Sequence, residues 1–263
     1  MNIIEQFTLS KTGELDDNED RIVVTEHFAT VIDGMTPKDC SLYGGLSSAQ
    51  IAIDLIAQEI RAFPADINCL QGINRLTRRL KNYYIHHQIA EEVASRPFKR
   101  LGASLIVYSK LRKEIWMVGD CHCLIDGVRF SNEKMIDHFI ANMRSKLIEQ
   151  YLKRYSLSEL LEFDRSREDI IPFLIQQYDF QNNNDDSPLS YAVLDGFPIH
   201  EPKIVKRGIP DAKQIVLASD GYPMLQEHLV ETELLAAGTA GAGSALLSDS
   251  QIDQRLKERE RIV

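Results

Sequence analysis

The sequence has few cysteines and no hydrophobic run long enough to cross a membrane. Four cysteines among 263 residues are too few for a disulfide scaffold. The closest pair, Cys121 and Cys123, is spaced too tightly for two corners of a tetrahedral zinc site, and no second pair follows. We therefore expect these cysteines to be small buried residues in a reduced cytoplasm. No stretch of about 18 apolar residues occurs, and no basic segment precedes an apolar one at the start, so neither a transmembrane helix nor a signal peptide is expected.

Basic residues are also in the minority. The chain has 30 Lys and Arg against 39 Asp and Glu, which gives a net charge of -9 and a pI near 5.3. A nucleic-acid partner normally requires a basic face, and an anionic membrane repels an acidic protein. We therefore expect no nucleic-acid partner, no membrane partner and a cytoplasmic location. A phosphorylated substrate is still compatible with this charge, because bound divalent cations can reverse the local potential.

The sequence shows neither an internal repeat nor a clear linker. Its hydrophobic content of 44% and charged content of 26% are ordinary for a globular protein. We expect one domain over residues 1–263, with an atypical C-terminal segment at about 236–263. Within that segment, residues 236–245 are rich in Gly and Ala without periodicity and are expected to be flexible. Ser248 could cap a final charged helix that ends near Arg261.

Short apolar runs predict strands, and the connections between them predict hairpins. Residues 110–113 and the pair Asp126-Gly127 have the composition of tight turns. Strands joined by hairpins favour antiparallel sheets over a doubly wound parallel sheet. The strands are expected at 3–10, 21–24, 27–33, 103–109, 114–118, 122–125, 191–194, 202–206 and 214–219.

Helical periodicity separates the strand groups. Ser47, with Gln50 three residues later, is a capping-box signature, and an apolar stripe follows it at helical spacing. The resulting fold class is α+β: a sandwich of two mainly antiparallel sheets flanked by helices. Besides the helix that begins after Ser47, helices are expected at 67–94, 134–155, 156–163, 167–178 and 227–235.

Three apolar strands each run directly into an aspartate with a neighbouring glycine. The pairs are Asp33-Gly34, Gly119-Asp120 and Asp220-Gly221. A carboxylate at a strand end is held by a rigid sheet, and glycine allows close approach of backbone or of a solvated ion. Converging carboxylates repel one another unless cations intervene, and Mg²⁺ or Mn²⁺ are the natural partners of an all-oxygen set. The sequence therefore predicts one metal-binding carboxylate site.

Asp-Gly is also a common turn dipeptide, and a single such pair is more often a turn than a ligand. We interpret Asp126-Gly127 and Asp195-Gly196 as ordinary turns. The metal-site prediction rests on the joint order and strand context of the three other pairs.

Five short motifs follow one another between about residue 18 and residue 221. They are Asn18-Glu19-Asp20, the strand 28–35 that contains Asp33-Gly34, Gly102-Ala103-Ser104, Val118-Gly119-Asp120 and Ala218-Ser219-Asp220-Gly221. In order and separation they resemble the motifs of the PP2C (PPM) family of metal-dependent serine/threonine protein phosphatases, in their bacterial form. Each motif is short, and their order carries the resemblance.

The resemblance implies an αββα sandwich with two or three Mn²⁺ or Mg²⁺ ions at one end of the sheets. Asp33 would bridge two metals, Gly34 would lend its carbonyl, and Asp220 would bind the first metal. Glu19 would hold the second metal, directly or through water, with Asp20 supporting it. Asp120 and Asp220 would form a weaker third position. Asp33 and Asp220 would thus be the catalytic residues, and a metal-bridging hydroxide would attack phosphoserine or phosphothreonine in a protein substrate.

The chain departs from the family pattern at three places. The arginine that grips the phosphate upstream of the Glu-Asp pair is missing, with Lys11 the nearest base, so no substrate-binding residue is assigned. The motif after Asp33 lacks the family's second glycine or histidine. The final aspartate ligand has only the weak candidates Asp249 and Asp253. An alternative is therefore a catalytically impaired PP2C-like domain that acts as a binding or regulatory module, and a third possibility is a non-enzymatic structural domain.

Overall fold

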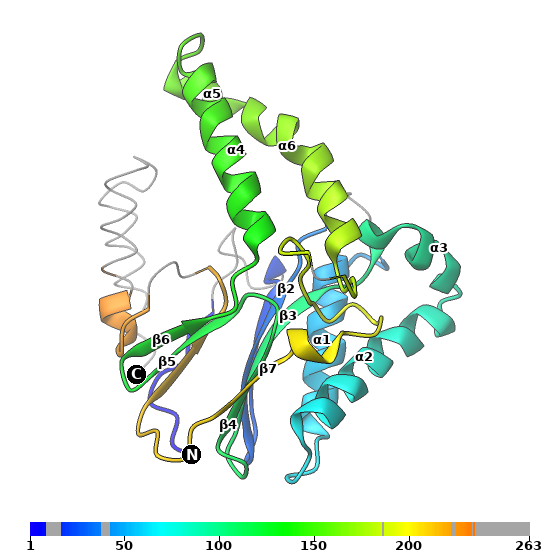
Figure 1. Cartoon of the computed structure of the whole chain (residues 1–263), viewed down its shortest axis with the longest axis vertical. Helices are drawn as coiled ribbons and strands as arrows, with labels where there is room; N and C mark the ends of the chain where they lie inside the picture. Colours follow the sequence, from blue (N-terminus) through cyan, green and yellow to red (C-terminus); the bar gives the residue numbers. More distant parts are fainter. Residues whose placement is uncertain (9–16, 38–42, 186, 222–224, 233, 235–263) are drawn as a thin grey trace.

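Two antiparallel sheets form the centre of the computed structural model, which describes residues 1–8, 17–37, 43–185, 187–221, 225–232 and 234 (Figure 1). The larger sheet has the strand order β1-β2-β3-β4-β7 and the smaller one the order β6-β5-β8. Every strand pair is antiparallel. The strands are β1 (Asp20–Val24), β2 (Phe28–Gly34), β3 (Ala103–Ser109), β4 (Glu114–Val118), β5 (His122–Ile125), β6 (Val128–Ser131), β7 (Val205–Gly208) and β8 (Ile215–Ala218).

Alternating side chains of the larger sheet build two separate cores. Leu105 and Val107 of β3 pack into the core that faces the helices. Ile106 of the same strand packs with Ile125 and Cys123 of the smaller sheet. Because successive strand residues point to opposite faces, the even-numbered residues of β3 face the space between the two sheets. This assignment fixes which polar residues can enter that space.

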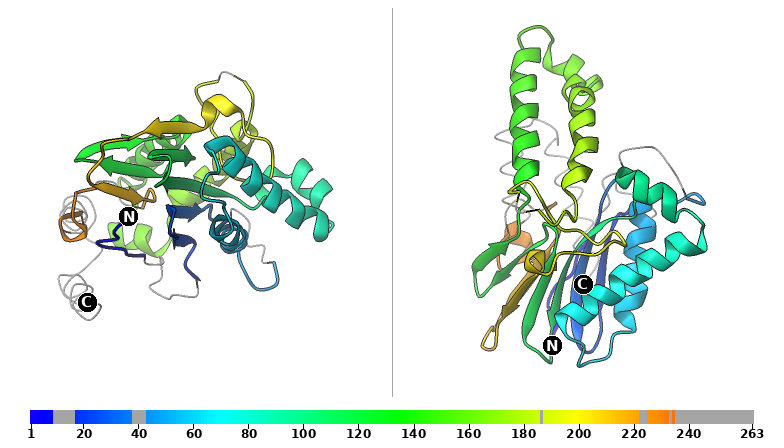
Figure 2. Two further views of the ribbon diagram at one scale, coloured as in Figure 1. Left: turned by 90° about the horizontal axis from the view of Figure 1, so that it is seen from below. Right: turned by 45° about the vertical axis from the view of Figure 1, so that its right-hand side comes forward.

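The helices α1 (Ser48–Arg61), α2 (Cys69–His86) and α3 (Ala90–Ser95) lie on one side of the larger sheet (Figures 1 and 2). The predicted capping box is confirmed: the Ser47 hydroxyl accepts from the Gln50 amide, and the Gln50 side chain accepts from the Ser47 amide. The single helix predicted over 67–94 is wrong, because the chain breaks after α2. Gln88 adopts a φ of 57° there, in the left-handed region.

A helical arm projects from one end of the sheets (Figures 1 and 2). It consists of α4 (Met135–Tyr151), α5 (Leu157–Glu162) and α6 (Arg165–Gln176), followed by the 3₁₀ turn η3 (Gln177–Phe180). We use the name "helical arm" for residues 135–180. Its base is packed in a small core of its own, made of Ile136, Ile140, Ile170, Tyr191 and Val193.

Several predicted strands differ from the structure. Residues 1–8 form no strand, and residues 9 and 10 lie outside the described residues. The segment 191–194 makes only isolated bridges from Tyr191 and Leu194. Its uniformly apolar composition predicts a strand, and its burial between two cores explains that composition equally well. The segment 202–206 begins in the 3₁₀ turn η4 (Glu201–Lys203) and enters β7 only at Val205.

The predicted fold class is confirmed: the protein is α+β, with two mainly antiparallel sheets and flanking helices. The turn at Asp126-Gly127 is confirmed as well, and it leads into β6, which was not predicted. Both turn residues have positive φ, 48° and 79°, as a tight hairpin requires. A further 3₁₀ turn, η2 (Pro97–Lys99), precedes β3. The predictions for residues 236–263 lie outside the described residues. Within the described part of the chain, every helix is too short or too polar to span a bilayer.

Candidate metal centre

Two aspartates and a serine line up across the first three strands of the larger sheet. Asp20 of β1 is the register partner of Asp33 in β2, and Asp33 is the partner of Ser104 in β3. Directly opposed residues of antiparallel strands point to the same face. Since Ser104 shares the face of Ile106, all three side chains point into the space between the two sheets, at one end of it.

Asp120 enters the same space from the chain segment that crosses between the sheets. Val118 ends β4 in the larger sheet and His122 begins β5 in the smaller one. The Ser104 hydroxyl donates to Asp120 Oδ1 at 2.5 Å. Gly119 makes this approach possible, because it has a φ of 85° and a Cβ there would lie 2.2 Å from Ser104 Oγ. The glycine before Asp120 is thus required both by the backbone and by close packing.

The end of β8 brings the last aspartate to the same place. The Ser219 hydroxyl donates to Asp20 Oδ2 at 3.1 Å. The Asp220 amide donates to Asp33 Oδ2 at 3.4 Å. Asp220 itself is exposed, whereas Asp33 is half-buried. The three Asp-Gly motifs and the predicted Asp20 therefore lie close together, and their role as metal ligands stays a prediction.

The pKa of Asp33 is affected by burial and by the nearby aspartates. Burial and the neighbouring charges of Asp20, Asp220 and Asp120 raise the pKa of Asp33 to about 9. A carboxylate that keeps its proton well above neutral pH marks a place with an excess of negative charge. A cation at this place would compensate that charge.

One positive charge is already supplied by the protein. Lys134 Nζ lies 2.7 Å from Asp120 Oδ2, and both side chains are 11% exposed. Burial acts to raise the pKa of Asp120, but the attraction and hydrogen bond of Lys134 outweigh it and the pKa is lowered. Burial likewise acts to lower the pKa of Lys134, yet its attraction to Asp120 leaves that pKa raised. Both partners of this buried pair are therefore charged.

Glu19, a predicted metal ligand, is held at the edge of the site. Its carboxylate accepts hydrogen bonds from Thr36 Oγ1 at 2.7 Å and from Ser47 Oγ at 2.9 Å. Its carbonyl accepts from the Gly34 amide at 2.8 Å. A Cβ on Gly34 would lie 2.6 Å from that carbonyl oxygen, so this position also requires glycine. The roles of Glu19 and of the Gly34 carbonyl as metal ligands stay predictions.

The structure also tests the two Asp-Gly pairs that were interpreted as turns. Asp195-Gly196 does form a turn, since Gly196 has a φ of 85°. Its carboxylate is nevertheless fully buried and accepts hydrogen bonds from Arg100, Gln181 and Asn182 at 2.7 to 2.9 Å. The interpretation as an ordinary turn is therefore incomplete, because Asp195 binds two other segments of the chain, at Arg100 and at Gln181-Asn182.

Three residues of the site were not singled out from the sequence: Ser104, Ser219 and Lys134. Ser104 and Ser219 occur inside quoted motifs, and their hydroxyls bind the aspartates of other motifs. Register with Asp33 could have identified Ser104 once β2 and β3 were paired. Lys134 has no local signal, because it precedes a long helix in an ordinary charged stretch.

The donor chemistry suits a hard divalent cation. Asp20, Asp33 and Asp220 offer only carboxylate oxygens, which Mg²⁺ and Mn²⁺ prefer. Over the described ranges, no three His, Cys, Asp or Glu side chains have the close spacing of a formed metal cage. The negative charge gathered around the half-buried Asp33 is the observation that fits a cation.

The cysteines and the nearby histidine behave as structural residues. Cys121 and Cys123 are buried and not oxidised to a disulfide. Burial raises the pKa of the Cys123 thiol to about 11, and it also raises the pKa of the Cys121 thiol. Burial also lowers the pKa of His122. Thiols that stay protonated are poor metal ligands, which agrees with the sequence-based exclusion of a zinc site.

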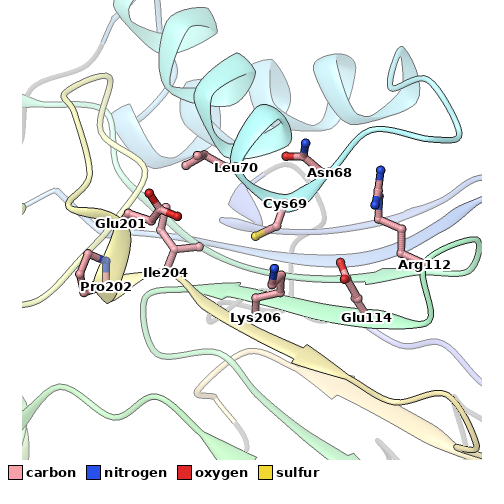
Figure 3. A pocket seen from close by; sticks show the side chains of 9 residues that line it. All are labelled: Asn68, Cys69, Leu70, Arg112, Glu114, Glu201, Pro202, Ile204 and Lys206. Carbon is pink, nitrogen blue, oxygen red and sulfur yellow. The ribbon is translucent and has the colours of Figure 1, made fainter.

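A cavity of about 680 Å³ lies apart from the aspartates of the candidate metal centre. Figure 3 shows the side chains around it, among them Cys69, Arg112 and Lys206. Glu114, another lining residue, begins β4, whereas Asp120 follows the opposite end of that strand. The cavity therefore belongs to the other end of the larger sheet, and the Arg112 guanidinium is already hydrogen-bonded to the Ile67 and Asp66 carbonyls.

The family's missing arginine is not supplied by the nearest described one. Arg21 follows Asp20 directly, but its guanidinium pairs with Asp54 of α1 at 3.1 Å. Lys11, Asp249 and Asp253 lie outside the described residues. Substrate-binding residues are therefore still unassigned.

Comparison with known proteins gives similarity to bacterial serine/threonine phosphatases. No protein-family model matches the sequence, and no curated protein matches it. Among solved structures, the chain is similar to the catalytic domain of serine threonine protein phosphatase PstP in complex with 2 manganese ions, with 16% identity and a TM-score of 0.41 over 92% of this chain and 84% of that one. It is similar to the Mycobacterium tuberculosis phosphatase PstP/Ppp, with 17% identity and a TM-score of 0.37 over 92% and 84%. It is also similar to the phosphatase Stp1 from Staphylococcus aureus, with 14% identity and a TM-score of 0.42 over 95% and 85%.

Proposed function

We propose that this protein is a metal-dependent phosphomonoesterase that dephosphorylates phosphoserine or phosphothreonine in proteins. The observation that carries the proposal is the meeting of Asp20, Asp33 and Asp220 at one end of the stacked sheets. Asp20 and Asp33 lie on the neighbouring strands β1 and β2, and Asp220 follows β8, 187 positions after Asp33. The raised pKa of Asp33 supports a cation requirement, because burial and the negative charges of the surrounding aspartates both disfavour a bare carboxylate there.

In this proposal Asp20, Asp33 and Asp220 hold Mn²⁺ or Mg²⁺, with Asp33 between the other two. Such cations, when bound, stabilise negative charge on phosphoryl oxygens and make a water molecule a better nucleophile. Ser219 orients Asp20 through its hydroxyl, and the Asp220 amide orients Asp33. These hydrogen bonds restrict the orientations that the two carboxylates can adopt.

The exposure of Asp220 supports a large substrate. Asp33 lies behind it, half-buried between the sheets, so a phosphoryl group would approach from the Asp220 side. A phosphorylated side chain on a protein can reach such an exposed edge. The protein-phosphatase assignment itself rests on the motif resemblance, with Asp33 and Asp220 as the catalytic residues.

The test is hydrolysis of p-nitrophenyl phosphate and of a phosphothreonine peptide with Mn²⁺ and with EDTA. Turnover should require Mn²⁺ and fall at least about 100-fold in Asp33→Asn and in Asp220→Asn, since each substitution removes an anionic ligand. The matched control is Asp211→Asn, an exposed aspartate on the surface, which should keep wild-type turnover. Turnover that persists in EDTA, or in both site variants, would contradict the proposal.

The second candidate is a catalytically impaired domain that binds a phosphoprotein or a regulatory partner. The pairing of Arg21 with Asp54 favours it, because this arginine is then not available to grip a phosphate. Tight Mn²⁺ binding without turnover on either substrate would select this candidate. Absence of Mn²⁺ binding in wild type would contradict both.

A further inference from the structure

Both oxygens of the Asp120 carboxylate are engaged by the protein itself. Oδ1 accepts a hydrogen bond from Ser104 at 2.5 Å, and Oδ2 lies 2.7 Å from the Lys134 ammonium. Each side chain of the ion pair is only 11% exposed. The Asp120 carboxylate is therefore less open to a further ligand than an exposed carboxylate is, because its ion pair is buried and it already accepts a hydrogen bond.

Lys134 is fixed at the base of the helical arm. It is the residue directly before α4, whose first turn is anchored by the buried Ile136. Its ammonium lies over the Tyr191 ring, 5.3 Å from the centroid, and 4.0 Å from the Asp137 carboxylate. The lysine is thus held on three sides and cannot simply swing into solvent.

We propose that the Lys134 ammonium takes the place of a metal ion at Asp120, so that this protein binds no cation at Asp120 and binds its cations at the other carboxylates around Asp33. This inference rests on the proposed function, since it concerns the number of cations that the same site accepts. It removes the third position that the sequence resemblance implied at Asp120.

Charge and solvation support this assignment. A divalent cation on Asp120 would stand within a few ångströms of the ammonium, and like charges at that distance repel strongly in a poorly hydrated place. Displacing Lys134 instead would leave a buried ammonium without its partner, which is strongly unfavourable. A lysine also differs from a metal ion in that it cannot dissociate, so the charge at Asp120 is permanent.

The experiment counts Mn²⁺ bound per chain by equilibrium dialysis and by the loss of the free Mn²⁺ electron paramagnetic resonance signal. Wild type is compared with Lys134→Ala, Lys134→Arg and Asp120→Asn. Lys146→Ala is the matched control, because Lys146 belongs to the same helical arm and its side chain is 75% exposed in a pair with Glu149. Circular dichroism establishes that each variant is folded.

Lys134→Ala should bind one more Mn²⁺ per chain than wild type, and adding Asp120→Asn should remove it again. Lys134→Arg and Lys146→Ala should bind the wild-type number. An unchanged number in folded Lys134→Ala would overturn the inference. If Lys134→Ala does not fold, Asp120→Asn provides the test by itself. The same number of bound Mn²⁺ ions as in wild type supports the inference, and the loss of one Mn²⁺ ion overturns it.

The number of Mn²⁺ ions that wild type binds tests the proposed function separately. Wild type that binds no Mn²⁺ contradicts the proposed function. The difference in bound Mn²⁺ between wild type and the Lys134 and Asp120 variants tests only the role of Lys134, whatever number of ions wild type binds.

Discussion

The Asp220 amide donates a hydrogen bond to Asp33 Oδ2 across 187 sequence positions. Asp33 belongs to the larger sheet, whereas Asp220 follows the last strand of the smaller one. Asp20 and Asp33 are neighbours within the larger sheet, and Asp220 joins them only when the two sheets are stacked. Because of this, the site and the folded state depend on each other, and stability measurements can report on site residues.

The pH dependence of stability should reveal the raised pKa of Asp33. In the folded state this pKa is raised from 3.8 to about 9, because of burial and the neighbouring aspartates. The folded protein then holds a proton that the unfolded chain releases, so the stabilising contribution is complete below about pH 4 and is lost as the pH rises towards about 9. We expect the melting temperature of the EDTA-treated protein to fall over this range, and to fall less in Asp33→Asn.

The measurement is differential scanning calorimetry at several pH values, with Asp211→Asn as the control that should follow wild type. Parallel melting curves for wild type and Asp33→Asn would mean that Asp33 has an ordinary pKa.

The glycine before Asp120 should be essential for stability. In Gly119→Ala the new Cβ would lie 2.2 Å from Ser104 Oγ, at a φ of 85° that alanine rarely adopts. We expect a loss of about 2 kcal/mol or more in urea unfolding. Gly208→Ala is the matched control, since a Cβ on Gly208 would meet no atom within 4 Å and this variant should lose much less. Equal losses in the two variants would contradict the packing argument.

Asp195 should carry much of the stability of the region next to the arm. Its carboxylate is 0% exposed and pairs with Arg100 at 2.9 Å. Removal of one partner from a buried ion pair leaves an uncompensated charge, so Asp195→Ala should lose about 3–5 kcal/mol in urea unfolding. The exposed pair of Lys146 and Glu149 gives the comparison, and Glu149→Ala should lose less than about 1 kcal/mol. A loss in Asp195→Ala as small as that would show that burial of the pair adds little.

The N-cap residue of α1 should contribute more to the stability of the protein than the N-cap residue of α5. Both Ser47 and Ser156 close complete capping boxes. Ser47 also donates to Glu19, and α1 is buried against the larger sheet, whereas α5 lies on the exposed arm with no buried residue. We expect Ser47→Ala to lower the free energy of unfolding by about 1–2 kcal/mol, and Ser156→Ala to lower it by less. Thermal unfolding of both variants would decide, and the reverse order would contradict the contribution of Glu19.

Local sequence signals predicted the parts of this fold that depend on local physics. The strand over Ala103–Ser109 and the hairpin turn at Asp126-Gly127 were recognisable, because apolar runs and turn dipeptides act within a few residues. The cap at Ser47 was recognisable for the same reason. The convergence of Asp33, Asp120 and Asp220 was inferred from their shared context; the Asp220 amide does contact the Asp33 carboxylate, and a metal site formed by the three residues stays a prediction.

Interactions between distant segments were not predictable in the same way. The binding of Lys134 to Asp120 depends on where the arm begins relative to the crossover between the sheets, and no local pattern encodes it. The same holds for Asp195, whose sequence is that of a turn and whose partners come from other segments. The apolar segment Tyr191–Leu194 was misjudged because composition alone does not separate a strand from a buried connection.

The two residues that flank the helical arm bind different carboxylates. Lys134, just before the arm, binds Asp120, and Gln181, just after it, donates to Asp195 at 2.7 Å. The stretch between these two anchors could therefore be shortened or extended in evolution while the sheets keep their arrangement. The length of the arm is in this sense independent of the two carboxylate contacts at its base.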